Sequence, residues 1–165
     1  MSKTTLAYLL LGSNLGDRAA LLRGAREYLA ATAGEIVAAS QFYETAAWGR
    51  EDQPAYLNQA LAVQTGLLAP ALLAACLATE QQAGRERLER WGSRTLDVDV
   101  LFFGNAIIDT PALTVPHPRL AERRFVLVPL AEIASALVHP QLGETVATLL
   151  ARCPDPLPVR RWHGE

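Results

Sequence analysis

Apolar segments of two periodicities follow one another along the first two thirds of the chain, and their order restricts the fold more than any other feature. Strands are predicted at Thr4–Leu11, Ile36–Glu44, Leu57–Thr65 and Leu96–Phe103. Helices are predicted from Asp17 to Gly34 and from Pro70 to Gly84, where apolar residues recur at helical spacing. The order strand, helix, strand, strand, helix, strand is typical of a ferredoxin-like α+β fold, with helices on one face of an antiparallel sheet.

The last third of the chain adds a proline-rich loop, Leu113–Arg119, and two predicted helices, near Val126–Ala134 and Glu144–Arg152. The length of 165 residues suits one domain, and half of the residues are hydrophobic, which is enough to bury a core. The sequence has no internal repeat and no low-complexity segment. We therefore expect one domain over residues 1–165, with helical additions at its C-terminal end.

Charge and cysteine content argue against several classes of protein. Asp and Glu number 17 against 15 for Lys and Arg, so bulk charge does not favour non-specific nucleic-acid binding. Cys76 and Cys153 lie far apart without a CxxC motif, which is typical of reduced thiols in a cytoplasmic protein. The apolar N-terminal run is too short for a membrane span and lacks a signal-peptide cleavage pattern. We expect a cytoplasmic monomer that binds small molecules, without membrane or nucleic-acid partners.

Two carboxylates, Asp97 and Asp99, interrupt the otherwise apolar strand Leu96–Phe103. Residues i and i+2 of a strand point to the same face, so both carboxylates can reach one cation. Paired oxygen ligands suit Mg²⁺, which completes its coordination with waters and substrate phosphates. Taken alone, however, an Asp-x-Asp pair is better explained by acids facing solvent on an amphipathic strand.

An arginine-rich segment directly precedes this strand. It contains Arg85, Arg87, Arg90 and Arg94 within ten positions. Metal-binding carboxylates together with guanidinium groups are what phosphoryl transfer requires, because both neutralise charge on the transferring group. The chain has no GxxxxGK[ST] loop, and Gly12-Ser13-Asn14-Leu15-Gly16 lacks the P-loop lysine. The combination therefore indicates a phosphate clamp, although an arginine run alone is usually a solvated surface.

Aromatic and amide side chains cluster around the predicted strand Leu57–Thr65. They include Tyr43, Trp48, Tyr56 and Asn58. Aromatic rings enclose flat heterocycles, and an Asn amide offers both a donor and an acceptor, which suits a pterin or guanine edge. Without further context, ordinary packing explains the same residues.

Four motifs in this order resemble the 6-hydroxymethyl-7,8-dihydropterin pyrophosphokinase family. They are GSNLGDR near the start, DQPAYLNQA at Asp52–Ala60, RWGSRTLDVDVLFFG at Arg90–Gly104 and LTVPHPRLAERRFVLVPLAEIA at Leu113–Ala134. The similarity extends from about Leu9 to Pro140. Ala46 and Ala47 stand where this family often has prolines, and Pro118 stands where it commonly has Tyr.

The resemblance implies transfer of pyrophosphate from ATP to the pterin hydroxymethyl group in folate biosynthesis, with two Mg²⁺ ions bound by Asp97 and Asp99. The pterin site would contain Thr45, Trp48, Tyr56, Asn58 and Phe125. The ATP site would contain Glu80, Arg85, Arg87, Trp91, Arg94, His117 and Arg123. Arg85 and Arg94 would assist the transfer itself as catalytic residues.

Two other functions fit part of the pattern. A nucleotidyltransferase also pairs strand carboxylates with Mg²⁺ and a nucleoside triphosphate, but it transfers AMP and releases pyrophosphate. A regulatory ferredoxin-like module would bind a small ligand without consuming ATP, and it would leave the Asp pair and the arginines unexplained.

Overall fold

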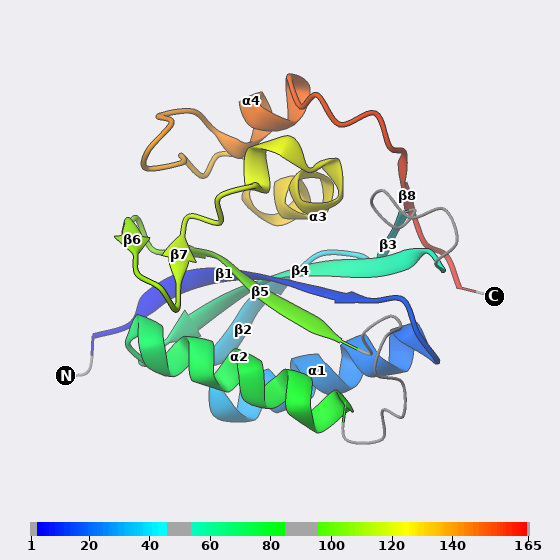
Figure 1. The fold of residues 1–165 in the computed structure, drawn as a ribbon, viewed down its shortest axis with the longest axis horizontal. Helices are drawn as coiled ribbons and strands as arrows, with labels where there is room; N and C mark the ends of the chain where they lie inside the picture. The colour runs from blue at the N-terminus through cyan, green and yellow to red at the C-terminus, as the bar shows by residue number, and fades with distance from the viewer. Residues whose placement is uncertain (1–2, 46–53, 85–95, 165) are drawn as a thin grey trace.

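The computed structural model describes residues 3–45, 54–84 and 96–164, and a six-stranded antiparallel sheet lies at its centre (Figure 1). The strand order is β5-β1-β4-β3-β8, and β2 pairs with the second half of β4. The strands of this sheet are β1 (Thr5–Ser13), β2 (Glu35–Ala39), β3 (Tyr43–Thr45), β4 (Tyr56–Thr65), β5 (Asp97–Phe103) and β8 (Val159–Arg161). The long strand β1 lies between β4 and β5, so segments distant in sequence become neighbours.

Helices cover both faces of the sheet (Figure 1). The two predicted N-terminal helices are confirmed as α1 (Arg18–Thr32) and α2 (Ala69–Ala83), which pack on one face. The opposite face is covered by α3 (Arg124–Ala134) and α4 (Val146–Ala151). The C-terminal helices are therefore not peripheral: they bury one face of the sheet and complete an arrangement of three layers.

Alternation along the strands divides the buried side chains into two cores. In β1, Leu9 and Leu11 belong to the core under α1 and α2, whereas Tyr8 and Leu10 belong to the core under α3 and α4. In β4, Leu57, Leu61 and Val63 face α1, as their alternation predicts, and Ala60 and Ala62 face α3. A sheet buried on both faces explains why β1 is a continuous apolar run.

The predicted strand Ile36–Glu44 is wrong as one element, because the chain bends at Ser40 and divides it into β2 and β3. The hydroxyl oxygen of Ser40 accepts the Ala60 N–H at 2.9 Å, where a main-chain carbonyl would do so in a regular ladder. The Ser40 carbonyl instead accepts the Gln59 side-chain amide at 2.8 Å. Local side-chain hydrogen bonds of this kind compete with the strand ladder.

The remaining elements are short. A hairpin of β6 (Ile108–Asp109) and β7 (Thr114–Val115) precedes a 3-10 helix at Leu120–Glu122, and β7 lies within the predicted loop Leu113–Arg119. At the start of α1, the Asp17 carboxylate accepts the Ala20 N–H at 3.1 Å. At its end the C-cap is Ala33 rather than Gly34, although Gly34 is still required: a Cβ there would lie 2.2 Å from the Gln64 carbonyl oxygen.

Candidate active site

The register of the central strands places four candidate residues in one row across the sheet. Gly12 of β1 pairs with Asp97 of β5 on one side and with Asn58 of β4 on the other, and Asn58 pairs with Tyr43 of β3. Directly paired residues point their side chains to the same face. That face is the one toward α3, because the Tyr43 hydroxyl donates to Glu132 of α3 at 2.6 Å.

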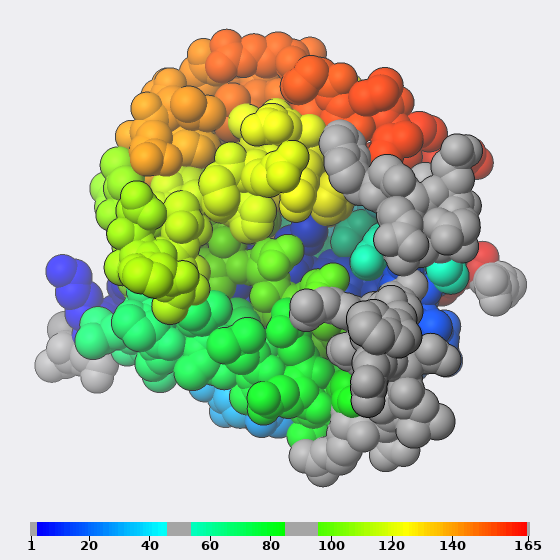
Figure 2. All heavy atoms as spheres, viewed as in Figure 1, coloured from blue at the N-terminus to red at the C-terminus, as the bar shows by residue number. Residues whose placement is uncertain are grey.

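Gly12 leaves the middle of this row without a side chain. A Cβ at this position would lie 2.6 Å from the Asn58 Nδ2 atom, closer than any ordinary contact. The Asn58 amide therefore extends over Gly12, on the side of the sheet where Asp97 lies. Figure 2 shows atoms of β5 exposed in a hollow between α3, in yellow, and α2, in green.

The Asn58 side chain is buried and only partly satisfied. Its Nδ2 atom donates weakly to the Leu11 carbonyl at 3.4 Å, and its Oδ1 atom has no hydrogen-bond partner among the residues that the structure describes. A buried amide oxygen without a donor costs about 1–3 kcal/mol. A ligand with a ring N–H would recover this energy, so the amide is suited to a heterocycle edge.

Two more of the predicted pterin residues lie in the next position along these strands. Thr45 pairs with Tyr56, so both side chains share the face of Asn58. The Thr45 hydroxyl is buried and donates to the Pro158 carbonyl at 3.2 Å. Phe125 lies in the first turn of α3, above the same face, with the Arg123 guanidinium 5.6 Å from its ring centre.

Asp97 and Asp99 are confirmed to share one face, because Asp97 pairs with Gly12 and Asp99 pairs with Leu10. Both are half-buried. The charge of Asp99 also acts on Arg123: burial and the neighbouring Arg119 lower the pKa of Arg123, and Asp99 partly opposes this shift. A carboxylate pair thus lies beside a partly buried guanidinium, an arrangement suited to a metal-bound polyphosphate.

His117 lies beside the same arginines. Its main-chain N–H donates to the Leu101 carbonyl of β5 at 3.0 Å, which fixes the loop to the strand of the two aspartates. Its Nδ1 atom accepts the Arg119 N–H at 3.2 Å. Burial lowers the pKa of His117, and Arg123 and Arg119 lower it further, so the ring is neutral at pH 7 and its Nε2 atom is the donor.

Glu80 reaches the site from the other face of the sheet. Its carboxylate accepts the Val98 N–H at 2.8 Å, at the outer edge of β5 and between the two aspartates in sequence. Glu80 and Asp99 both act on the thiol of Cys76. Burial raises the pKa of this thiol to about 12, and the charges of Glu80 and then Asp99 contribute to the shift. Glu80 therefore lies close to the carboxylate pair.

Asp155 supports the site but was not predicted from the sequence. The buried carboxylate of Asp155 accepts the Arg124 N–H and the Leu157 N–H, each at 3.0 Å. The Asp155 carbonyl in turn accepts from Arg124 Nε at 3.1 Å. These bonds hold the first residue of α3, next to Arg123 and Phe125. The local sequence around Asp155 is the triplet Pro154-Asp155-Pro156, which predicts a stiff turn. It does not predict that Asp155 contacts Arg124.

The remaining predicted residues, Trp48, Arg85, Arg87, Trp91 and Arg94, lie outside the described residues. Within residues 3–45, 54–84 and 96–164, no group of three or more His, Cys, Asp or Glu side chains forms a metal cluster. Two carboxylates without further protein ligands still fit Mg²⁺, which binds through one or two carboxylates plus waters and substrate phosphates.

Comparisons with known proteins identify the family of this chain. Residues 8–135 match the family model of 7,8-dihydro-6-hydroxymethylpterin-pyrophosphokinase (HPPK). A 2-amino-4-hydroxy-6-hydroxymethyldihydropteridine pyrophosphokinase of Methylorubrum extorquens is 50% identical over 158 residues, covering 95% of this chain and 98% of that protein. The enzyme of the same name from a Synechocystis strain is 45% identical over 141 residues, covering 85% of this chain and 72% of that protein.

A solved structure of Plasmodium falciparum HPPK-DHPS, described with pterin and p-hydroxybenzoate, superimposes with a TM-score of 0.68. The alignment covers 92% of this chain and 43% of that longer chain, at 15% sequence identity, so it supports the fold alone. A crystal structure of HPPK-DHPS in complex with substrates gives the same TM-score of 0.68, at 14% sequence identity.

The fold, the family match and the pair of carboxylates on β5 thus define a transferase of the phosphate-transferring class. The chain belongs to the 7,8-dihydro-6-hydroxymethylpterin-pyrophosphokinase family, and it is a diphosphokinase of folate synthesis. None of the helices in the described part of the chain is both long and apolar enough to cross a membrane.

Proposed function

We propose that the row Asp97–Gly12–Asn58 is the reaction axis of this pyrophosphokinase. One observation carries the proposal: a buried amide with an unpartnered oxygen and a carboxylate lie on either side of a glycine, on one open face of the sheet. Neighbouring strands are about 4.8 Å apart, so the Cα atoms of the two residues lie roughly 10 Å apart across the sheet. A pterin edge on Asn58 would direct its hydroxymethyl group over Gly12 toward Asp97.

The pterin would be held by its edge and by its flat faces. Asn58 Oδ1 would accept a ring N–H, and Nδ2 would donate to a ring acceptor. Tyr56 and Phe125, with Trp48, would contact the ring, and Thr45 would border the pocket. Burial of the amide makes recognition selective, because a ligand without matching groups leaves Asn58 unpaired.

The triphosphate of ATP would lie on the side of Asp97 and Asp99. These carboxylates would hold two Mg²⁺ ions, which neutralise phosphate charge when bound. Arg123 and the neutral His117 would donate to the nucleotide, and Glu80 would complete this side of the site. Arg85, Arg87, Trp91 and Arg94 are proposed as further ATP contacts, with Arg85 and Arg94 acting on the transferring group.

In the proposed reaction, the hydroxymethyl oxygen attacks the β-phosphorus of ATP. The bond between that oxygen and Pβ forms, the bond between Pβ and the oxygen bridging to Pα breaks, and AMP leaves with the bridging oxygen. The hydroxyl proton passes to solvent. We propose that catalysis comes mainly from positioning the two reactants and from stabilising charge on the transferring phosphates.

We further propose that the enzyme acts as a cytoplasmic monomer, with residues 1–165 forming one domain and small molecules as its only partners. Both cysteines are buried free thiols, as is usual in reducing compartments. The slight negative charge does not favour nucleic acid. Size-exclusion chromatography with light scattering tests the monomer directly: a mass above 17.9 kDa per particle would contradict it.

The decisive experiment incubates the protein with ATP, Mg²⁺ and 6-hydroxymethyl-7,8-dihydropterin and identifies the products. We expect AMP and the pterin diphosphate, and no product when Mg²⁺ is removed with EDTA. Release of pyrophosphate with AMP joined to an acceptor would instead indicate a nucleotidyltransferase. Ligand binding without consumption of ATP would indicate a regulatory module.

A further inference from the structure

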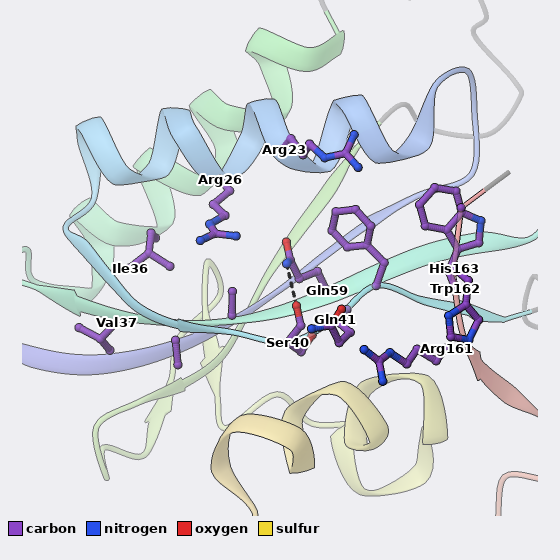
Figure 3. Close-up of a pocket in the computed structure, with 14 residues that line it drawn as sticks. Arg23, Arg26, Ile36, Val37, Ser40, Gln41, Gln59, Arg161, Trp162 and His163 are labelled. Carbon is purple, nitrogen blue, oxygen red and sulfur yellow. Dashed lines mark hydrogen bonds between the residues drawn. The ribbon is translucent and has the colours of Figure 1, made fainter.

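A second pocket lies away from the proposed reaction axis, on the face of the sheet that α1 covers. It is formed where the chain bends between β2 and β3, and it encloses about 770 Å³. This volume is within the range of small-molecule sites. Its α1 side is lined by Arg23, Arg26, Ile36, Phe42, Gln59 and Trp162 (Figure 3).

Three arginines line this pocket, Arg23, Arg26 and Arg161, and the first two come from α1. Arg23 and Arg26 lie three positions apart on α1, so their side chains leave the same side of the helix. Figure 3 shows Arg26 extending from α1 toward the sheet and Arg23 extending along α1, and neither takes part in an ion pair among the described residues. The Arg23 guanidinium lies 5.5 Å from the centre of the Phe42 ring. Like charges held side by side repel each other, and a shared anion would remove this repulsion.

Gln59 supplies an independent observation at the base of the pocket. Its side chain is buried, and its Nε2 atom is fixed by donation to the Ser40 carbonyl at 2.8 Å. This bond turns the Oε1 atom toward α1 (Figure 3), and Oε1 has no hydrogen-bond partner within the described part of the chain. The pocket therefore combines two cationic donors with one acceptor that lacks a donor.

Aromatic side chains form one wall. Phe42 and Trp162 lie with ring centres 5.9 Å apart, and the Trp162 N–H of the main chain donates to the Phe42 carbonyl at 2.9 Å. The wall comes from two segments distant in sequence, so the pocket exists only in the folded chain. An apolar wall beside two guanidinium groups lowers the local dielectric and strengthens binding of an anion.

We propose that this pocket binds a singly protonated phosphate group, either free inorganic phosphate or the phosphate of a monoester. The anionic oxygens pair with the guanidinium groups of Arg23 and Arg26, which are suited to two-point recognition of phosphate. The P–OH group is the donor that Gln59 Oε1 lacks. A fully ionised carboxylate has no such donor, so phosphate is the better match.

The test measures binding of inorganic phosphate and of AMP by calorimetry and by NMR, with chloride at the same ionic strength as the reference. The side-chain amide signals of Gln59 report on the pocket itself. We expect these signals to shift with phosphate and not with chloride. A stronger shift with AMP identifies a monoester as the occupant, because the aromatic wall then contributes; equal shifts identify the phosphate group alone.

Substitutions separate this pocket from the reaction site. Arg23→Gln and Arg26→Gln are each expected to weaken phosphate binding about tenfold, because each removes a charge-assisted contact. Arg160→Gln is the matched control: it removes the same charge from exposed β8, outside the pocket, and should bind phosphate normally. All three variants should keep their rate of AMP formation.

Three outcomes would overturn the proposal. The Gln59 signals could fail to respond to phosphate and to AMP, or binding could be equal in Arg26→Gln and Arg160→Gln. A response to an acidic peptide but not to phosphate would instead assign the pocket to a protein partner. Because activity is measured separately, a failure here leaves the proposed reaction untouched.

Discussion

Asp97 and Asn58 lie in the same row of the sheet, on either side of Gly12, and both side chains face α3. It brings together a carboxylate and a buried amide that are separated by 39 positions in sequence. Neither residue alone identifies a reaction, because a strand carboxylate and a buried amide are both common. We propose that their connection across a residue without a side chain would direct a heterocycle toward a metal-bound phosphate.

The first prediction concerns this connection. Gly12→Ala introduces a Cβ that would lie 2.6 Å from Asn58 Nδ2, so the amide must turn away. We expect the KM for the pterin to rise at least about tenfold, because the amide no longer meets the ring edge. The KM for ATP should change little. Steady-state kinetics with each substrate varied in turn measures both.

Gly24→Ala is the control for that change. A Cβ at Gly24, inside α1, meets no atom within 4 Å. This substitution should leave the kinetics unchanged and stabilise the helix by about 0.5–1 kcal/mol. A normal pterin KM in Gly12→Ala, with Gly24→Ala behaving as expected, would show that the pterin does not bind along this row.

The second prediction concerns the metal. Asp97→Asn keeps the shape of the side chain and removes its charge, so Mg²⁺ affinity should fall and turnover should drop by about a hundredfold or more. Urea unfolding without ligands should show that the variant still folds cooperatively, so that a loss of turnover reports on the metal. Activity titrated against Mg²⁺, combined with urea unfolding, separates the two effects. Full turnover at ordinary Mg²⁺ concentration would reject Asp97 as a ligand.

The third prediction concerns the start of α3. Asp155→Ala leaves the partly buried N–H groups of Arg124 and Leu157 without their acceptors, which should destabilise the protein by about 1–3 kcal/mol. Since Phe125 follows directly, the pterin KM should rise as well. The milder Asp155→Asn keeps one acceptor oxygen and should restore part of both losses. Asp109→Ala, at an exposed site, is the control, and an equal loss of stability there would contradict this role.

The fourth prediction concerns alkaline pH. Burial raises the pKa of Tyr43 to about 12, and its hydrogen bond to Glu132 contributes to the shift. In the unfolded chain the pKa is about 10, so the stability from neutral Tyr43 is complete below pH 10 and is lost as pH rises toward 12. Tyr43→Phe should be less stable at neutral pH but should lose less between pH 10 and 12. Parallel curves for the two proteins across this range would contradict the assignment.

Several features could be predicted from the sequence because they depend on local periodicity. The i, i+2 spacing of Asp97 and Asp99 fixes a shared face wherever a strand forms, and the register confirms it. Pro70 at the start of α2 and Asp17 at the start of α1 act through neighbours a few residues away. The resemblance to a family extended this local information to Asn58 and Phe125.

Other features depend on contacts between distant segments and left no local signal. The bend at Ser40 depends on a hydrogen bond from the Gln59 side-chain amide, 19 positions later, to the Ser40 carbonyl. Asp155 meets Arg124 across 31 positions. The pairing of β1 with both β4 and β5, which creates the row through Gly12, follows from the packing of two cores and not from any one strand.

The hydrogen bond from Val98 to Glu80 has a consequence beyond the site. Strand β5 ends the sheet on one side, and its outward N–H groups form a template on which another chain could add a strand. The Glu80 carboxylate occupies one of these groups and places a negative charge along the edge. A residue proposed to lie beside the phosphates would thereby also oppose aggregation, so Glu80→Ala should make the concentrated protein self-associate even where its fold is intact.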